Sequence, residues 1–545
     1  MKITGAQAMV LALKKENVRT IFGYPGAAIC PFYDALLDSG IEHILTRQEQ
    51  GAAHAANGYS RASGKVGVCV ATSGPGATNL LTGLATAYLD SIPLVAVTGQ
   101  VDTSSIGKDV FQEVDITGAC EPFIKYSYLI KNPKDLPRIF KEAFYIASTG
   151  RPGPVLIDVP SDIQKAELEF EFPGSINIRG YDPVYKIDEE AAQLMMKKLR
   201  DAKKPVICAG GGIISSGAKE SLGSFAERFN IPVVTTLMGI GSIDRGHKLN
   251  LGMLGSHGVY TANYAIHHAD CIIVAGARIG DRAMGKIKTI REDQQVIHID
   301  IDAAEIGKNV PVNVPIVCDA RAVFEYLLNN FDKSGIDTQR GWNKEIFAMK
   351  EEKKYDYSKL EGKGYIRPQI VLKEMSSMLG DNDIITTEVG QNQIWAANHV
   401  DISKDRKLLS SGGLGTMGYG FPCAIGAKAA DRKRQVIDVA GDGSFQMSIQ
   451  ELATIAANGL AVKVLLLNNS KLGMVREVQA KAYAKRYCAT CLDGNPDFMK
   501  LADAYGIAGK KIEDPGDVRD ALSEMLSYQG PYILECVIDK DEDTL

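Results

Sequence analysis

Two short apolar runs flank a helical pattern in the last third of the chain. Residues 436–440 and 462–467 are apolar runs of strand length. Between them Ile449, Leu452, Ala453, Ile455 and Ala456 recur at helical spacing, and Asn458-Gly459 is a helix stop. The pattern predicts a strand, a helix and a second strand, and this alternation is typical of a parallel sheet.

The first part of the chain repeats this layout. Apolar runs predict strands at residues 18–22, 41–45, 66–71 and 93–98, with helical patterns at 51–61 and 77–88 between them. Glycine-rich or polar sequence follows each run. We therefore expect the first and last segments to share one α/β design, although their sequence match is too weak to prove a duplication.

A third α/β segment lies between these two. Strands are expected at residues 205–209, 232–236, 271–275 and 296–301. Charged sequence with Pro and Gly at about 164–187 and polar sequence at about 332–364 indicate linkers. The predicted fold class is α/β, with three doubly wound parallel-sheet domains at residues 1–165, 188–331 and 365–545.

Composition narrows the class of protein. A length of 545 residues suits roughly three to four domains. The net charge of -5 and the absence of a basic run argue against nucleic acid as a partner. Apolar runs of strand length argue against a membrane span, and the amphipathic N-terminus does not resemble a signal peptide. Ten scattered cysteines favour a reduced, cytoplasmic protein.

Cys488 and Cys491 are the only cysteines with C-x-x-C spacing. No second pair stands nearby to complete a zinc site. A metal or redox role for this pair is therefore the less favoured interpretation.

Polar residues follow both strands of the C-terminal unit. Gly441 and Gly443 permit a tight turn around Asp442, and Asn468-Asn469 ends the second strand. Carboxylate and amide oxygens, with backbone carbonyls, suit Mg²⁺ that also holds water and phosphate. An isolated G-D-G is often an ordinary turn. Followed after 24 residues by N-N, it is the thiamin-diphosphate motif.

The middle segment carries glycines and acidic residues at strand ends. Gly210, Gly211 and Gly212 follow one predicted strand, and Asp300 ends another. Such residues allow a dinucleotide's phosphates to approach the backbone and its ribose to find a partner. A purely structural domain explains them equally well.

These features, with several longer strings, make the chain similar to the catalytic subunits of the acetolactate synthase (acetohydroxyacid synthase) family. The likeness covers nearly the whole chain in the family's order. It is carried by Glu49, Gly441-Asp442-Gly443, Asn468-Asn469 and residues 73–76, 111–113, 150–154, 253–258, 411–418 and 473–475.

The resemblance implies a carboligase that uses thiamin diphosphate, Mg²⁺ and a structural FAD. It would decarboxylate pyruvate and transfer the two-carbon unit to a second 2-keto acid, giving 2-acetolactate in branched-chain amino acid biosynthesis. The active site would lie between two copies of the chain, so at least a homodimer is expected, and a tetramer is possible. A small regulatory subunit is a further expected partner.

The resemblance also implies site residues. Asp442, Asn469 and Lys471 would hold the metal. Thiamin diphosphate would contact Tyr24, Pro25, Gly26, Pro75, Asn79, Gly390, Gln391, Asn392, Gly415, Met417, Gly441, Gly443, Ser444, Gly473 and Met474. FAD would contact Gly210, Gly211, Gly212, Thr235, Gly255, His257, Arg278, Asp300 and Asp319.

Catalytic roles follow from the same likeness. Glu49 would share a proton with the cofactor's aminopyrimidine ring, although a Glu at a strand end is usually only solvated. Met417 would support the bent cofactor, where its alternative is to fill a gap. Arg282 would grip the acceptor's carboxylate, and its alternative is a surface Arg. Phe111 and Gln112 would line the same pocket from the partner subunit.

The chain departs from the family pattern at several positions. Gln48 and Asn392 stand where His is usual, and neither can titrate. Ala27, Ser161 and Ser256 replace a common Gly, Lys and Met. Val478 replaces a Trp that shapes the acceptor pocket, so we expect little preference for 2-ketobutyrate over pyruvate. The family continues beyond the position of Leu545 into an arm that helps to close the site, so we expect either a truncated form or a site that closes in another way.

Three rival functions remain open at this point. The first is an FAD-dependent pyruvate oxidase, which shares the three-domain plan. The second is another thiamin-diphosphate carboligase or acyltransferase of a specialised pathway. The third is an inactive subunit that only binds cofactor or partners, which the intact Glu49, Asp442 and Asn469 disfavour.

Overall fold

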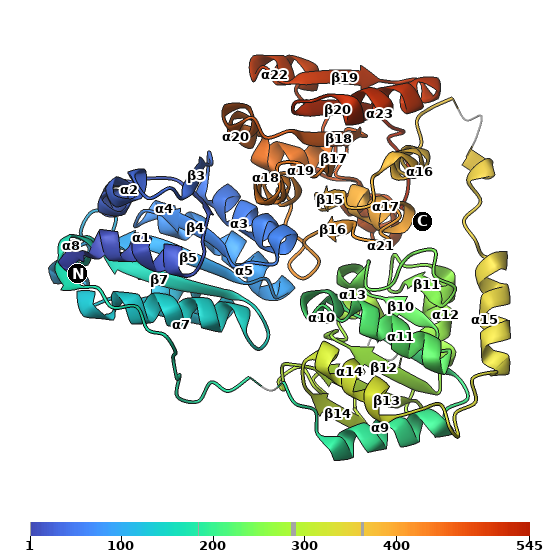
Figure 1. Cartoon of the computed structure of the whole chain (residues 1–545). Coiled ribbons are helices and arrows are strands. Elements are labelled where there is room, and N and C mark those ends of the chain that lie inside the picture. Colours follow the sequence, from blue (N-terminus) through green and yellow to red (C-terminus); the bar gives the residue numbers. More distant parts are fainter. Residues whose placement is uncertain (1, 184, 285–289, 361–363, 545) are drawn as a thin grey trace. The chain divides into compact units, whose positions relative to one another are not determined.

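The computed structural model describes residues 2–183, 185–284, 290–360 and 364–544. The chain divides into two compact units. The first unit comprises Met1–Asp182, Asp383–Gln393 and Leu409–Asp541, and the second Pro183–Asn382, Ile394–Leu408 and Glu542–Leu545. Three six-stranded sheets form the framework of the fold (Figure 1).

The N-terminal sheet has the strand order β3-β2-β4-β5-β7-β6, and its pairings are parallel. Its strands are β2 (Thr20–Gly23), β3 (Glu42–Leu45), β4 (Gly67–Ala71), β5 (Leu94–Gln100), β6 (Tyr126–Leu129) and β7 (Pro154–Pro160). Its helices are α1 (Gly5–Lys15), α2 (Cys30–Leu37), α3 (Glu49–Ser63), α4 (Pro75–Asn79), α5 (Leu81–Asp90), α6 (Ile116–Cys120), α7 (Leu136–Ser148) and α8 (Ser161–Lys165).

Alternate residues of its strands enter two different cores. Val68 and Val70 of β4 pack with the side chains of α1, α2 and α7, whereas Cys69 and Ala71 pack with those of α3 and α5. Successive strand residues point to opposite faces, so a continuous apolar run means a sheet covered on both sides. This is the doubly wound arrangement that the sequence predicts.

The C-terminal sheet has the order β16-β15-β17-β18-β20-β19. Its strands are β15 (Ile384–Thr387), β16 (Lys407–Leu409), β17 (Val436–Gly441), β18 (Val462–Asn468), β19 (Ala508–Ile512) and β20 (Tyr532–Val537). Its helices are α16 (Pro368–Met378), α17 (Gln391–His399), α18 (Gly420–Ala430), α19 (Asp442–Phe445), α20 (Leu452–Asn458), α21 (Gly473–Ala482), α22 (Phe498–Ala504) and α23 (Val518–Ser527), with a 3-10 turn at Gln446–Glu451.

The first and last sheets have one topology. When the strands of each sheet are counted in chain order, both read 2-1-3-4-6-5. The expectation of one design used twice is therefore confirmed at the level of strand order.

The middle sheet has a different order, β11-β10-β9-β12-β13-β14, and is parallel throughout its recorded pairings. Its strands are β9 (Pro205–Ala209), β10 (Val233–Thr235), β11 (Asn250–Met253), β12 (Cys271–Ala275), β13 (Gln295–Asp300) and β14 (Val314–Val317). Its helices are α9 (Glu189–Asp201), α10 (Gly211–Ser215), α11 (Lys219–Phe229), α12 (Tyr260–His268), α13 (Asp281–Met284) and α14 (Ala320–Asn330).

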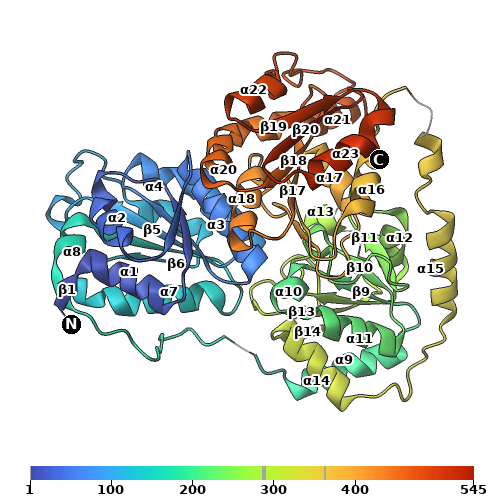
Figure 2. The ribbon, with the colours of Figure 1, turned by 45° about the horizontal axis from the view of Figure 1, so that its top comes forward.

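This middle order reads 3-2-1-4-5-6 in chain order, which is the dinucleotide-binding arrangement. Figure 2 shows α9, α11 and α14 gathered on one side of the sheet, where their side chains share a core with alternate strand residues. The fold class, with three doubly wound domains, is confirmed.

The segments that were expected to be linkers are not structureless. Glu167–Glu169 forms β8, which pairs antiparallel with β1 (Lys2–Thr4). Gly341–Glu352 forms α15, which buries Trp342 and Ile346 in the core beside α12. The sequence pattern did not predict β8 or α15, because both segments are mostly polar. Each is held by a few apolar contacts rather than by a continuous apolar face.

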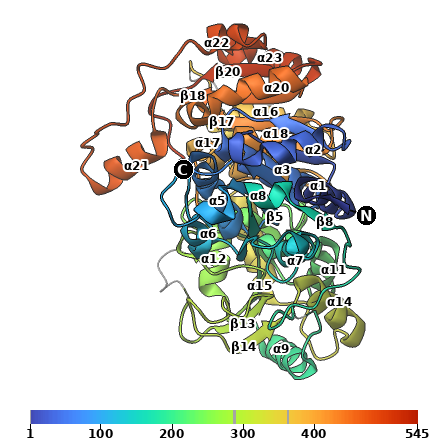
Figure 3. The same ribbon diagram turned by 90° about the vertical axis from the view of Figure 1, so that its left-hand side faces the viewer.

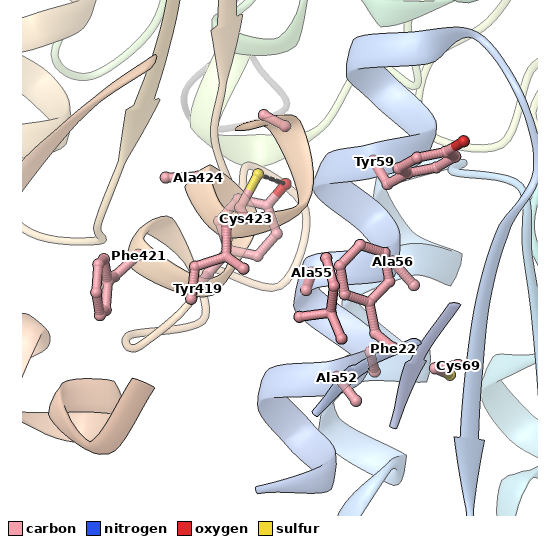
Figure 4. Close-up of a cluster of buried hydrophobic side chains, with 14 of the residues drawn as sticks. Phe22, Ala52, Ala55, Ala56, Tyr59, Cys69, Tyr419, Phe421, Cys423 and Ala424 are labelled. Carbon is pink, nitrogen blue, oxygen red and sulfur yellow. Dashed lines mark hydrogen bonds between the residues drawn. The ribbon is translucent and has the colours of Figure 1, made fainter. Parts of the chain in front are cut away.

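Helices α3 and α18 join the N-terminal and C-terminal sheets within the first unit. Figure 4 shows Tyr419 and Cys423 on the side of the α18 region that faces α3, the helix that carries Ala52, Ala55 and Ala56. A Cβ at Gly426 would lie 1.7 Å from the carbonyl oxygen of Ala55, and one at Gly58 would lie 2.0 Å from that of Cys423. Small residues on both helices therefore permit this close packing.

No helix among the described residues is long and apolar enough to span a membrane.

Candidate active site

The G-D-G turn lies at the carboxyl end of β17, where the sequence places it. β17 ends at Gly441, and Asp442 begins α19. Asn469 follows β18, which pairs in parallel with β17. The carboxyl ends of neighbouring parallel strands meet at one sheet edge, so Asp442 and Asn469 lie at the same edge.

Asp442 is a buried carboxylate that lacks a cationic partner among the described residues. Its Oδ2 accepts a hydrogen bond of 2.7 Å from the Asn495 amide. Burial raises the pKa of Asp442 to about 6, although the Asn495 amide and the Asn469 backbone N–H oppose this. A divalent cation at this position would offset the cost of burial, so the donor set fits Mg²⁺.

A chain of side-chain hydrogen bonds orients Asn469. Its Nδ2 donates to Gln391 Oε1 over 2.9 Å, and Gln391 Nε2 donates to Glu477 Oε1 over 2.7 Å. Asn469 Oδ1 accepts from the backbone N–H of Lys471 over 3.1 Å. Glu477 therefore acts on Asn469 through Gln391, and sequence reasoning did not find Glu477.

The backbone approaches closely around this turn. A Cβ at Gly473 would lie 1.7 Å from Gln391 Oε1, and one at Gly441 would lie 3.2 Å from Asn392 Oδ1. Asn392 Nδ2 donates to the carbonyl oxygens of Glu388 and Val439, which ties the ends of β15 and β17 together. Gly390, Ser444 and Met474 lie on the same loops and helix starts.

Glu388 organises the loop that carries Met417. Its side chain is fully buried, and its two oxygens accept the backbone N–H groups of Gly418 (2.7 Å) and Phe421 (3.0 Å). Gly415, with φ of 72°, and half-buried Met417 precede this anchor point. Burial raises the pKa of both Glu388 and Asp438, and the charge of Glu388 adds to the rise at Asp438.

The N-terminal sheet carries a second cluster, around Glu49. The Glu49 Oε2 accepts a 2.9 Å hydrogen bond from Asn79, and its Oε1 lies 3.3 Å from a Cβ built at Gly76. A Cβ at Gly26 would meet the Thr72 side chain at 2.5 Å. The buried Thr72 hydroxyl has no partner among the described residues, which suits a ligand at this point.

Glu49 is the first residue of α3 rather than the end of a strand, because β3 already stops at Leu45. The buried carboxylate of Glu451 accepts the backbone N–H groups of Arg47 (2.9 Å) and Gln48 (3.1 Å). It thereby satisfies the N-terminal end of α3 and places Glu49. Glu451 lies 402 positions from Glu49, so sequence reasoning missed it.

The loop with Phe111 and Gln112 lies beside the Ser73-Gly74 turn. A Cβ at Gly74 would lie 3.0 Å from Gln112, which adopts a left-handed φ of 60°. Glu113 accepts backbone N–H groups of Gly107, Lys108 and Val110 and so closes the loop. Phe111 is left 86% exposed, so this chain alone does not cover it.

The structure thus gathers the unit-one residues into two groups. Asp442, Asn469, Lys471, Gln391 and Gly473 form one, and Tyr24, Pro25, Gly26, Glu49, Pro75 and Asn79 form the other. No hydrogen bond among the described residues joins Glu49 to Asp442 or Asn469. Val478 lies on α21 and is 52% exposed.

The remaining residues belong to the second unit and lie at the carboxyl edge of its sheet. Gly210–Gly212 follow β9 and meet Gly276 after β12, with the Gly212 N–H donating to the Gly276 oxygen over 2.9 Å. Thr235, Gly255, His257, Arg278 and Asp300 follow or end neighbouring strands. Asp319 lies two residues after β14 and caps the N-terminus of α14, and Arg282 lies in α13.

A Rossmann-type strand order with glycines at its switch point fits a dinucleotide in this unit. The close backbone approach at Gly210, Gly212 and Gly276 is the observation that favours it. Arg282 stays a predicted acceptor-binding residue.

Two sheets share one strand order. One carries the G-D-G…N-N motif at its carboxyl edge, and the other carries half-buried Glu49 at the start of α3. This arrangement is that of a thiamin-diphosphate enzyme. Comparison with known families agrees. Residues 3–119, 192–327 and 388–536 match the N-terminal, central and C-terminal domains of the thiamine pyrophosphate enzymes.

Full-length relatives specify the family. A probable acetolactate synthase large subunit of Methanococcus aeolicus is 47% identical over 98% of this chain and 92% of its own length. The acetolactate synthase large subunit of Lactococcus lactis is 45% identical (99% and 94%), and the isozyme 2 large subunit of Escherichia coli is 44% identical (99% and 96%). The chain belongs to the family of acetolactate synthase large subunits.

Proposed function

We propose that this chain decarboxylates pyruvate and joins the two-carbon unit to a second 2-keto acid, which yields 2-acetolactate and serves branched-chain amino acid synthesis. The likeness of 44–47% over nearly the full chain carries the proposal. Bound thiamin diphosphate would supply the electron sink that lets a 2-keto acid lose CO₂.

The chain's own residues would bind and orient the reactants. Asp442 and Asn469, with the backbone near Lys471, would hold Mg²⁺ and through it the diphosphate. Glu49 would hold a proton at the aminopyrimidine nitrogen, and Asn79 keeps its carboxylate in place. Met417 would support the cofactor from the loop that Glu388 anchors.

Three features of the proposal concern partners and the second cofactor. FAD would bind at the glycine-rich edge of the middle sheet. Phe111 is uncovered within one chain, which supports a site completed by a second copy. A small regulatory subunit is a further proposed partner, since the relatives are named large subunits.

Product analysis tests the activity. Purified protein is incubated anaerobically with pyruvate, with thiamin diphosphate, Mg²⁺ and FAD each added or withheld. We expect acetolactate to form without oxygen and to depend on thiamin diphosphate and Mg²⁺. Acetate formation that requires an electron acceptor would instead identify a pyruvate oxidase. No acetolactate from either the wild type or Glu49→Gln would point to an inactive subunit.

The acceptor preference rests on Val478. We propose that an exposed Val on α21 leaves the acceptor pocket open, so pyruvate and 2-ketobutyrate compete about equally. Val478→Trp should shift the product ratio towards 2-aceto-2-hydroxybutyrate by roughly tenfold, about the discrimination that one well-filled apolar contact supplies. Competition with both acceptors measures the ratio, and Val475→Trp on the same helix is the matched control. An unchanged ratio would refute the role of Val478.

A further inference from the structure

A small cavity lies beside the loop that follows β18 and shares Lys471 with the candidate metal site. Its volume is about 180 Å³, and it is lined by Lys471, Arg476, Tyr487, Cys488, Ala489, Thr490 and Cys491. Figure 3 shows α21, which carries Arg476, projecting outward from the C-terminal sheet. Two thiols and two cationic side chains therefore share one concave surface.

The two thiols are accessible, in contrast to most of the others. Cys488 and Cys491 are exposed, and Ala489 between them has a left-handed φ of 54°, so the chain turns within the pair. Burial raises the pKa of the Cys69, Cys208 and Cys271 thiols to about 12, which makes them unreactive. Cys30 is exposed but stands on α2, far from this pair in the sequence.

The segment that carries the thiols is bonded to the candidate metal loop. Cys491 pairs antiparallel with Lys471. The Leu472 N–H donates to the Thr490 oxygen over 2.9 Å, and the Leu492 N–H donates to the Ser470 oxygen over 2.8 Å. These bonds hold residues 490–492 against the three residues that follow Asn469.

The same segment also packs on the G-D-G turn. A Cβ at Gly443 would lie 2.7 Å from Leu472 Cδ2 and 3.0 Å from Leu492 Cδ1. A shift of Leu492 would therefore displace Gly443, the residue after Asp442. The thiol segment supports both halves of the metal site.

The charges around the cavity favour an anionic ligand. Lys471 Nζ lies 3.5 Å from Cys491 Sγ. Arg476 stacks on the Tyr487 ring at 4.6 Å and pairs with Asp541, and Lys540 lies 3.5 Å from Asp493, which also bonds to Cys491. The lining of the cavity therefore holds two cations, Lys471 and Arg476, and no carboxylate, while Asp493 and Asp541 lie next to it.

We propose that Cys488 and Cys491 form a thiol-modification site that reacts with small anionic disulfides of the glutathione class, and that their internal disulfide loosens the candidate metal loop. In the first step one cysteine sulfur attacks the disulfide RSSR, which forms a mixed disulfide and releases one RSH. In the second step the other cysteine attacks the protein sulfur and releases the second RSH. The protein loses two thiol hydrogens, and RSSR is reduced to two RSH.

The second effect follows from geometry and rests on the proposed metal site. An S–S bond fixes the separation of the two Cβ atoms at about 3.5–4.5 Å. Any shift of Cys491 that this bond requires acts on its pairing with residues 470–472. Asn469 directly precedes this pairing, so its orientation towards a metal is expected to degrade. Mutation of residues that orient metal ligands typically lowers the affinity for the metal by roughly tenfold or more.

The experiment treats the complete chain with oxidised glutathione, in the presence and absence of thiamin diphosphate and Mg²⁺. Intact-mass and peptide-mass measurements follow the thiols, and Mn²⁺ titration by paramagnetic resonance follows the metal loop. We expect a Cys488–Cys491 disulfide to form first, Mn²⁺ affinity to fall roughly tenfold, and dithiothreitol to restore it.

Matched variants separate the possible outcomes. Cys488→Ser and Cys491→Ser should each stop at the mixed disulfide, whereas Cys30→Ser should behave as wild type. Preferential modification of Cys30, or no modification of the pair, would overturn the proposal. A disulfide that leaves Mn²⁺ affinity unchanged would overturn its coupling to the metal loop. Mass measurements detect the thiol modification directly. The proposal for the thiol pair is therefore tested independently of whether the protein forms acetolactate.

Discussion

At the scale of single residues, the site depends on buried carboxylates that touch backbone N–H groups. Glu388 accepts two N–H groups around Met417, and Glu451 accepts two that begin α3. Both act through backbone rather than on substrate, so they are positioning residues. Each pairs elements that lie far apart in the sequence.

Glu388→Gln should weaken the Met417 loop. The substituted amide keeps one oxygen but turns an NH₂ group towards a backbone N–H, which leaves a buried donor without an acceptor. We expect a loss of about 1–3 kcal/mol in unfolding free energy and weaker binding of thiamin diphosphate. Urea unfolding and a cofactor titration measure the two effects.

The control for this change is Glu220→Gln on α11, where the side chain is exposed. It should leave both quantities unchanged. Equal behaviour of the two variants would contradict the anchoring role of Glu388.

Asp158 should make stability depend on pH. Its carboxyl accepts hydrogen bonds from Thr98 and Gln100, and burial raises its pKa to about 7 from 3.8. Because the folded pKa is raised, the contribution is complete below about pH 4 and is lost as the pH rises through about 7. The stability of wild type relative to Asp158→Asn should therefore fall over this window, by on the order of a few kcal/mol. Urea unfolding from pH 4 to 8 measures it, and parallel pH profiles would exclude this assignment.

At the scale of elements, helices α3 and α18 carry the junction within the first unit. Gly58 and Gly426 allow the two backbones to approach, and Arg61 bonds to the Ser410 oxygen (2.8 Å) and the Tyr419 hydroxyl (3.0 Å). The α3 helix also starts with Glu49. Packing of these two helices therefore positions Glu49, the proposed catalytic residue, as well as forming a core.

Gly426→Ala should destabilise this junction. Its Cβ would lie 1.7 Å from the Ala55 oxygen, a backbone atom that cannot rotate away. Overpacking of this kind costs about 1–3 kcal/mol. Thermal unfolding measures the loss.

Gly223→Ala on α11 is the matched control, because nothing lies within 4 Å of its Cβ. It should stabilise the protein by about 0.5–1 kcal/mol, the helix preference for Ala over Gly. A destabilised Gly223→Ala, or a neutral Gly426→Ala, would contradict the packing argument.

At the scale of the whole molecule, ligands should act on one unit each. The proposed Mg²⁺ and thiamin diphosphate residues lie in the first unit, and the proposed FAD residues lie in the second. A ligand stabilises the unit that binds it, by about 2.7 kcal/mol when its concentration is a hundred times the dissociation constant.

Calorimetry tests this division. We expect two unfolding transitions, of which Mg²⁺ with thiamin diphosphate raises one and FAD raises the other. Asp442→Asn should abolish the first shift and leave the second intact. A single transition that both ligands raise equally would show that the units unfold together.

Much of the fold was predictable from sequence because strand and helix signals are local. The run at 271–275 became β12 with identical bounds, and the G-D-G turn lies at its predicted sheet edge. Helix α15 and strand β8 were missed because their apolar contacts are few. Glu49 was placed at a strand end, because the chain between Leu45 and Glu49 gave no local helix-start signal.

The sequence by itself determined the α/β class, the thiamin-diphosphate motif and the family, because local periodicity and fixed spacings carry that information. Only the tertiary structure decided the supports of the site: Glu388 beneath the Met417 loop, Glu451 at the start of α3, Glu477 behind Gln391 and Asn469, and the thiols beside the metal loop. These are contacts between residues distant in sequence, and no periodicity or spacing encodes which of many buried carboxylates meets a given backbone N–H.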